Sequence, residues 1–243
     1  MRYSKIEKTI VLSLLLSSSI YGTASAVPLV SDNTEGFITD GTSTDYDGNN
    51  QDINFNVYQD ADSRMGFGIW AHGNNTTGDA LANYDNINNL TINVHTYAYE
   101  YLDPANKFSQ ELAAGIIAGK TPYIGSELNQ NDNKKATVEI NVKNNVNLDI
   151  ETRNEKSSYG IYSKKNGSVN ITTNEGSINI NARKGLSTYK ALPYHIENAD
   201  YTANVYGIKA ENTGEIILKA GDSIMNCTPK VGQKTTFGGA VFL

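Results

Sequence analysis

The chain has 243 residues, of which 20 are Lys or Arg and 26 are Asp or Glu, giving a formal net charge of −6. An acidic chain with scattered cations has no basic stripe to neutralise phosphates, so we expect no nucleic-acid partner. Asparagine occurs 30 times and glycine 21 times, whereas proline occurs only five times. Asn and Gly tolerate the left-handed conformation of tight turns, so this composition favours many short strands over helices.

Residues 1–26 have the layout of a secretory signal peptide. The basic start, apolar centre and small-residue end are Arg2, Lys5 and Lys8, then Ile10–Leu16, then Ala24–Ala26. This layout predicts cleavage between Ala26 and Val27 and export of the remainder. A membrane anchor is the alternative, but a spanning helix needs roughly 20 mostly apolar residues. Here serines and a glycine interrupt the run, and no other segment has the character of a span.

Cys227 is the only cysteine, so the exported chain has no intramolecular disulfide. Small secreted domains commonly rely on disulfides, and this chain must instead rely on a repetitive backbone ladder or a large core. We expect Cys227 to be a small apolar residue at a strand end. An intermolecular bridge is the alternative.

A Gly-Ile dipeptide followed by a small residue recurs four times, in FGIWA, AGIIA, YGIYS and YGIKA. The glycines are Gly68, Gly115, Gly160 and Gly207, at intervals of 47, 45 and 47 residues. Such a period predicts stacked units, because one unit alone cannot bury its apolar face. We expect the isoleucines to share one level of the core and the glycines to mark a tight turn into each strand. The aromatic residue before the glycine is expected to be stacked surface, with a ligand platform as the alternative.

Alternating apolar and polar residues predict further strands within each unit. They are SVNI and EIIL as second strands, and SINI and SIMN, around Ile178 and Ile224, as third strands. Long excursions are expected over His72–Asn89, Gly119–Lys135 and Ala182–Val205. The fold class is therefore predicted as all-β, a parallel β-solenoid (β-helix) of about four three-strand coils with long loop excursions. After the signal peptide (1–26), residues 27–51 are expected to be a lead-in or cap and 52–243 the solenoid repeats, starting with DINFNV as the end of an incomplete coil.

The stretches Tyr159–Ile171, Ser177–Asn181 and Tyr206–Leu218 include motifs of the form Y-G-I-x-A/S…N-G-S-V-x-I. Together with the signal peptide, they resemble the N-terminal passenger region of Gram-negative autotransporters, the type V secretion proteins. The resemblance implies a β-helical stalk, display at the cell surface and anchoring in the outer membrane through a C-terminal barrel. No barrel-like strand pattern follows, and no cap is evident after the last repeat. We therefore expect the chain to be truncated before the barrel; a released short solenoid is the alternative.

No residue pattern in the sequence supports catalysis or metal binding. Some passengers are serine proteases, but Ser223 in GDS is followed by Ile224 where that pattern needs Gly, and it matches a corner in the preceding unit. The histidines, His72, His95 and His195, lack the spacing of a zinc pair. DYDGNNQD, starting at Asp45, has calcium-like residues, but its Gly is misplaced and Asn56 occupies the twelfth position, so a loose polar loop is expected. No catalytic, cofactor or metal residue is predicted.

These observations predict an exported, surface-displayed structural or adhesive stalk that is not an enzyme. Its partners are expected to be host or bacterial surface proteins or glycans, bound through the long loops. Tyr97, Tyr99 and Tyr101 alternate, which suits a buried strand face or a ligand contact. The alternative function is a secreted carbohydrate-active β-helix enzyme, which needs clustered carboxylates. The sequence does not bring its acids together; they include Asp149, Glu151, Glu139 and Asp222.

Overall fold

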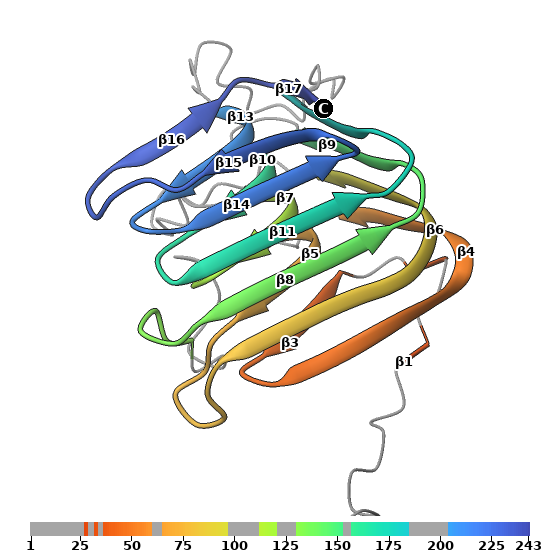
Figure 1. Cartoon of the computed structure of the whole chain (residues 1–243). Helices are drawn as coiled ribbons and strands as arrows, with labels where there is room; N and C mark the ends of the chain where they lie inside the picture. Colours follow the sequence, from red (N-terminus) through yellow and green to blue (C-terminus); the bar gives the residue numbers. More distant parts are fainter. Residues whose placement is uncertain are drawn as a thin grey trace, which may run out of the picture.

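The computed structural model describes residues 27–28, 32–33, 36–59, 65–96, 112–120, 130–152, 157–184 and 204–243. The expected signal peptide with Ala26, the tyrosines at 97, 99 and 101, His195 and most of the excursion over 182–205 lie outside these residues. The described part is all-β and contains no helix. Its strands form one 11-stranded and one six-stranded sheet, and most pairings are parallel (Figure 1).

The six-stranded sheet carries the Gly-Ile repeats. Its strands in spatial order are β16 (Lys234–Phe237), β13 (Val205–Glu211), β10 (Ser157–Ser163), β7 (Leu112–Ala118), β5 (Met65–His72) and β3 (Phe37–Asp40). One repeat lies on each of β5, β7, β10 and β13. Ile69 pairs with Ile116, Ile116 with Ile161 and Ile161 with Ile208. The prediction that the repeated isoleucines occupy one level of the core is confirmed.

The larger sheet curls around the interior in two rows of strands (Figure 1). It contains β1 (Val27–Pro28), β2 (Asp32–Asn33), β4 (Ser43–Gln59), β6 (Ala80–Thr96), β8 (Ala136–Val142), β9 (Val146–Thr152), β11 (Gly167–Thr173), β12 (Ile178–Lys184), β14 (Glu215–Ala220), β15 (Ser223–Cys227) and β17 (Ala240–Phe242). The first half of β6 pairs with β8 and its second half pairs with β9. From β3 to β12, the chain therefore repeats one path, which we call a circuit. Each circuit consists of one strand in the small sheet followed by a strand segment in each of the two rows of the large sheet.

Asparagines line the corner between the two rows of the large sheet. Asn86 has a φ of 55° at the bend of β6, a left-handed conformation that Asn adopts more readily than most residues. The amide of Asn144 donates to Asn88 at 2.7 Å, and that of Asn145 donates to Asn89 at 3.2 Å. These side-chain bonds link equivalent corners of successive circuits and satisfy polar groups at each bend.

Three expectations about strand positions were wrong. The excursion expected over His72–Asn89 is a short turn followed by the first half of β6, which begins at Ala80. The first circuit is complete, because β3 and the first half of β4 lie within 27–51 and pair with β5 and β6. SIMN, in β15, is no parallel third strand, since it pairs antiparallel with β14 after a turn at Gly221, whose φ is 53°.

Antiparallel strands end the stack. β15 pairs antiparallel with β14, β16 with β13 and β17 with β12. The last strand in each of the three rows therefore runs opposite to the strands before it. Cys227 is the last residue of β15 and is buried, as expected for an apolar role at a strand end. Burial also raises the pKa of its thiol.

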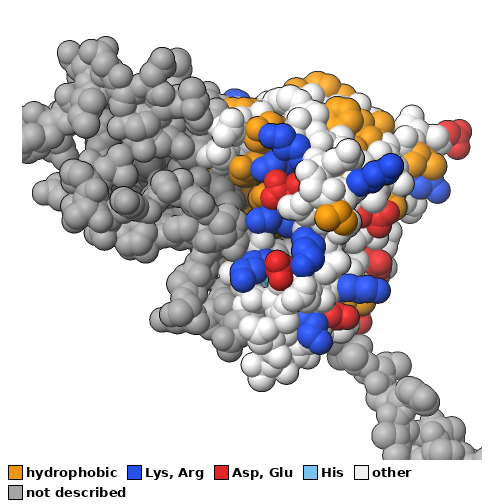
Figure 2. All heavy atoms as spheres, turned by 90° about the vertical axis from the view of Figure 1, so that its left-hand side faces the viewer, with side chains coloured by type: hydrophobic (Ala, Val, Ile, Leu, Met, Phe, Trp, Pro, Cys, Tyr) orange, Lys and Arg blue, Asp and Glu red, His pale blue; other side chains and the backbone are white. Residues whose placement is uncertain are grey.

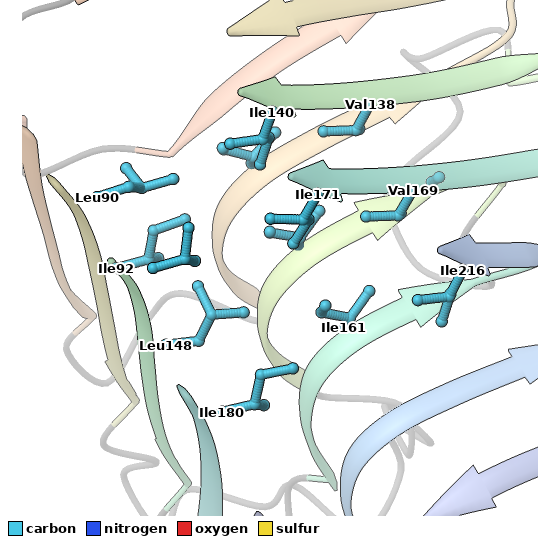
Figure 3. Close-up of a cluster of buried hydrophobic side chains, with 14 of the residues drawn as sticks. Leu90, Ile92, Val138, Ile140, Leu148, Ile161, Val169, Ile171, Ile180 and Ile216 are labelled. Atoms are coloured by element: carbon cyan, nitrogen blue, oxygen red, sulfur yellow. The ribbon is translucent and has the colours of Figure 1, made fainter. Parts of the chain in front are cut away.

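The core lies between the two sheets and is built from alternate residues of every row. Figure 3 shows inward-pointing side chains from all three rows meeting there, among them Ile92, Ile140, Ile161 and Ile180. These four are at most 1% exposed. Burying such side chains supplies the main favourable term in folding, about 1.5–3 kcal/mol each.

The repeated glycines serve close packing and not the tight turn that the sequence suggested. None has a φ in the left-handed region. A Cβ on Gly115 would lie 2.6 Å from the carbonyl oxygen of Gly160 and 3.0 Å from Ile150 Cδ1. The glycine therefore lets the small sheet approach both its own next strand and the opposite wall of the core.

Candidate functional site

The outer face of β10 and β13 carries a group of aromatic and charged side chains, which we call the aromatic–lysine strip. Its members are Tyr159, Tyr162, Lys164, Tyr206, Lys209 and Glu211. Tyr162 and Lys209 directly follow Ile161 and Ile208, which face the core, so alternation turns them away from it. The pairing skips Gly160 and Gly207, and this irregularity places Tyr159 and Tyr206 on the same face as Tyr162 and Lys209. The prediction of stacked aromatic residues before the repeated glycines is confirmed for Tyr159 and Tyr206, whose rings are stacked with centroids 5.6 Å apart. Tyr159 is buried, however, and does not belong to the surface as expected.

One lysine sits over three rings of the strip. Lys209 Nζ is 4.7 Å from the centroid of Tyr162, 5.4 Å from that of Tyr159 and 5.6 Å from that of Tyr206. Tyr159 and Tyr162 are themselves stacked, with centroids 4.7 Å apart and ring planes at 13°. A cation within about 6 Å of a ring face is attracted by the ring quadrupole. The three rings therefore hold the ammonium group at a fixed place.

Glu211 joins the tyrosines to the lysines. Tyr162 Oη donates to Glu211 Oε1 at 2.5 Å, Lys209 Nζ lies 3.0 Å from Oε2, and Lys164 Nζ lies 3.7 Å from Oε1. Burial favours the neutral acid, but the bonds from Tyr162 and Lys209 outweigh it and lower the pKa of Glu211. Burial and the neighbouring carboxylate raise the pKa of Tyr162. The strip thus contains two cations and one anion; of its rings, Tyr159 and Tyr162 are buried and Tyr206 is partly exposed.

The ring contacts of the strip continue to β5 as a buried cluster on the side of the six-stranded sheet away from the core. Trp70 is fully buried in this cluster, and its Nε1 donates to the Gly119 carbonyl oxygen at 3.0 Å. Its ring contacts Phe67 and His72, with centroid distances of 5.6 and 4.5 Å. Together with Ile117 and the tyrosines it forms a second hydrophobic cluster, separate from the core.

Lysines also gather at the neighbouring turns. Lys165 follows β10, and Lys230 and Lys234 lie before and at the start of β16. Figure 2 shows this side of the molecule, where Lys, Arg, Asp and Glu side chains lie among hydrophobic ones. Lys165 Nζ lies 3.9 Å from Asp132 Oδ2, whereas Lys230 and Lys234 are exposed cations of the kind that attract an anionic partner.

A second group, the acid–arginine cluster, lies on the outer face of β6, β9 and β12. It consists of His95, Asp149, Glu151 and Arg183. His95, Glu151 and Arg183 stand in one register column, so the parallel ladder brings them together. Arg183 bonds Asp149 through both terminal nitrogens, and its Nε donates to Glu151 Oε2 at 3.0 Å. His95 Nε2 lies 3.2 Å from Asp149 Oδ2.

The partners of Asp149 keep it ionised. Burial raises its pKa, but the hydrogen bonds from Arg183 and His95 exceed that effect, and the net pKa is lowered. The bonds to Asp149 raise the pKa of Arg183 in turn. A general acid needs the opposite shift, towards the working pH. Asp149 is therefore suited to holding Arg183 in place and not to donating a proton.

The sequence identified Asp149 and Glu151 as isolated acids and did not predict their convergence. His95 and Arg183 are 54 and 34 residues from Asp149. The sequence signal that could have predicted this convergence is that INVHT, LDIET and INARK occupy the same position in the last strand of successive units. Glu139 and Asp222 lie elsewhere, on β8 and in the turn before β15.

The residues considered for protease chemistry are not brought together as a site. Ser223 is exposed at the start of β15, whereas His72 is fully buried at the end of β5. His72 Nδ1 lies 3.3 Å from Asp40 Oδ1. Within the described ranges, no group of three or more His, Cys, Asp or Glu side chains is arranged to hold a metal ion.

DYDGNNQD is not the loose loop that was expected. It lies within β4, and its carboxylates accept hydrogen bonds from asparagines of the next circuit. Asn86 Nδ2 donates to Asp47 at 3.0 Å, while Asn88 and Asn89 donate to Asp52 at 2.7 and 2.8 Å. Those bonds lower the pKa of Asp52. The acids are thus structural partners of the corner asparagines.

No protein-family model, curated protein or solved structure matches the chain. No helix in the described part of the chain has the length and apolarity needed to cross a membrane.

Proposed function

We propose that the three rows of stacked strands form a parallel β-solenoid, and that the chain is an exported, surface-displayed structural and adhesive stalk of an autotransporter-like protein. Three features support the solenoid: the in-register Gly-Ile repeats, the parallel pairing of successive circuits and the corner asparagine ladders. The export signal and the passenger-like motifs support display on the surface of a Gram-negative cell.

The observation that carries the adhesive role is the aromatic–lysine strip. Its rings and charges are fixed by neighbouring strands, so little conformational entropy is lost when a partner binds. Lys164, Lys209 and Tyr206 are partly exposed, and they offer cations beside aromatic carbon. Such a surface suits glycans or protein segments that carry carboxylate or sulfate groups.

The test is adhesion of the purified chain to bacterial or host cells and to arrayed glycans. Lys209→Met keeps the aliphatic stem but removes the charge, and we expect it to weaken adhesion about tenfold, which corresponds to about 1.4 kcal/mol. Lys143→Met is the matched control, because Lys143 is exposed at the corner between β8 and β9. Equal adhesion by both variants, with unchanged melting temperatures, would count against the strip as the contact site.

The long loops are the competing contact sites on the same stalk. Replacing residues 121–129 and 185–203 with short Gly-Ser linkers tests them, since neither segment belongs to a described strand. We expect adhesion to be reduced and not abolished if the strip is the main contact. Complete loss, with the strands intact by circular dichroism, would move the binding site to the loops.

The acid–arginine cluster is the observation that favours the second function, a secreted carbohydrate-active β-helix enzyme. It places Asp149, Glu151 and Arg183 together on one outer face. Screening acidic and neutral polysaccharides for reducing-sugar release tests this function. Release by the wild-type chain that disappears in Asp149→Asn would replace the adhesive proposal. The lowered pKa of Asp149 leads us to expect no release.

A further inference from the structure

We propose that copies of this chain associate head to tail through the two ends of the six-stranded sheet, with β3 of one copy pairing antiparallel with β16 of the next. This proposal does not depend on the adhesive role. Within the described residues, β3 pairs only with β5 and β16 only with β13. Among the residues that the structure describes, each end strand therefore has a hydrogen-bonding edge without a partner strand, and such edges are templates for pairing with another chain.

The strand directions at the two ends are compatible. β3, β5, β7, β10 and β13 are parallel to one another, and β16 runs opposite to them. A copy translated along the stack therefore places its β3 antiparallel to β16. The larger sheet is less available, because β1 and β2 already pair with β4 at the same end. The contact is accordingly assigned to the six-stranded sheet.

The register of the sheet pairs matching residues across this contact. One core column runs from Phe37 through the four repeated isoleucines to Phe237. Phe237 is 38% exposed at the end of that column. In a translated copy Phe37 would lie opposite Phe237 and extend the core by one more level. Thr39 would lie opposite Thr235, a favourable cross-strand pair.

The same register pairs opposite charges. Asp40 is three residues after Phe37, and Lys234 is three residues before Phe237 in a strand of opposite direction. Asp40 of one copy would therefore lie opposite Lys234 of the next. Asp40 is 34% exposed, and Lys234 is also exposed. This pair fixes one register, because a shift of one residue would place Ile38 or Gly36, and not Phe37, opposite Phe237.

The charges of the two ends agree with this pairing. Residues 36–59 and 65–96, which form the first two circuits, contain six Asp and no Glu, Lys or Arg. Residues 204–243, which form the last circuit and its antiparallel strands, contain four Lys against three Asp or Glu. The first end is acidic and the second is close to neutral, so a head-to-tail contact avoids the repulsion of two acidic ends. Head-to-tail contact is therefore favoured over symmetric contact between two acidic ends.

Sedimentation velocity of the purified chain over a wide concentration range tests the proposal. A head-to-tail contact does not close on itself, so we expect oligomers whose mean length increases with protein concentration. Added salt should shorten these oligomers, because it screens the attraction between opposite charges. Lys234→Glu should weaken association about tenfold, because Asp40 then faces a second carboxylate. Lys143→Glu, the same charge change at mid-stack, should leave association unchanged. A chain that stays monomeric near 1 mM, or that stops at a dimer, would overturn the proposal.

A charge-swap mixture gives the sharpest result. Asp40→Lys and Lys234→Glu should each associate weakly alone, because like charges meet at every contact. Mixed in equal amounts, they should recover association, since every contact between unlike chains then pairs a lysine with an acid. Asp40 also accepts a hydrogen bond from Asn74 at 2.7 Å, so the melting temperature of the Asp40→Lys chain is checked first. If it is unfolded, the decision rests on Lys234→Glu against Lys143→Glu, and equal association of those two overturns the proposal.

Discussion

The backbone of Gly160 lies directly against the Ile180 side chain, on the opposite wall of the core. A Cβ at Gly160 would overlap Ile180 Cγ2 and the carbonyl oxygen of Gly207. We predict that Gly160→Ala lowers the free energy of unfolding by about 1–3 kcal/mol, the usual cost of overpacking a close-packed core. Gly238→Ala is the control, because a Cβ there meets nothing within 4 Å. Urea unfolding of both variants measures the difference, and equal stabilities would contradict this role of the glycine.

The sequence predicted strand rows well where the motif is regular. YGIYS and YGIKA each start a unit whose next apolar alternation follows after a short Asn-Gly or Thr-Gly turn, so β10, β11, β13 and β14 were recognised. The first half of β6 was missed because its inward positions include Ala80 and Ala82, and small residues give a weak alternation. Its bend at Asn86 also has the local composition of a loop.

Contacts between side chains of different circuits could not be predicted from local sequence patterns. The acid–arginine cluster forms because the ladder sets His95, Glu151 and Arg183 side by side, and that register follows from the whole stack. The reversal at β15 was missed for a related reason. SIMN has the same alternation as SINI. An alternating pattern indicates that a strand forms, but it does not indicate whether the strand pairs parallel or antiparallel with its neighbour.

Tyr162 and Glu211 provide a stability test of the aromatic–lysine strip. We predict that Tyr162→Phe lowers the free energy of unfolding by about 1–3 kcal/mol, because it removes a hydrogen bond to a half-buried carboxylate. Tyr206→Phe is the control, since its ring stacks on Tyr159 and its hydroxyl makes no such bond to Glu211. Thermal unfolding compares the two variants. A Tyr162→Phe chain as stable as the control would show that the bond adds nothing to stability.

Arg183 should make stability depend on pH in the acid range. The pKa of Asp149 is lower when folded than its ordinary value of 3.8, so the unfolded chain binds a proton first. The stabilising effect of ionised Asp149 is thus complete above pH 3.8 and is lost as the pH falls through the pKa of Asp149 in the folded chain. We predict that Arg183→Gln costs at most about 1 kcal/mol at neutral pH, because the cluster is partly exposed. The cost should shrink towards pH 3, about one unit below that value. Lys219→Gln, an exposed control, should show no such trend in urea unfolding.

His72 should make the stability of the fold depend on pH in a higher range than Asp149 does. It is fully buried beside Trp70 and Asp40, and burial lowers its pKa below 6.5 despite the opposing bond to the Gly73 carbonyl oxygen and the charge of Asp40. The unfolded chain therefore takes up the proton first, so stability is greatest above 6.5 and falls as the pH drops below it, by at most about 1.4 kcal/mol per unit. We predict that His72→Gln flattens this slope, whereas His95→Gln, at a partly exposed site, keeps it. Melting temperatures between about pH 8 and 5 decide, because Asp149 stays ionised there, and an unchanged slope in His72→Gln would assign the dependence to another group.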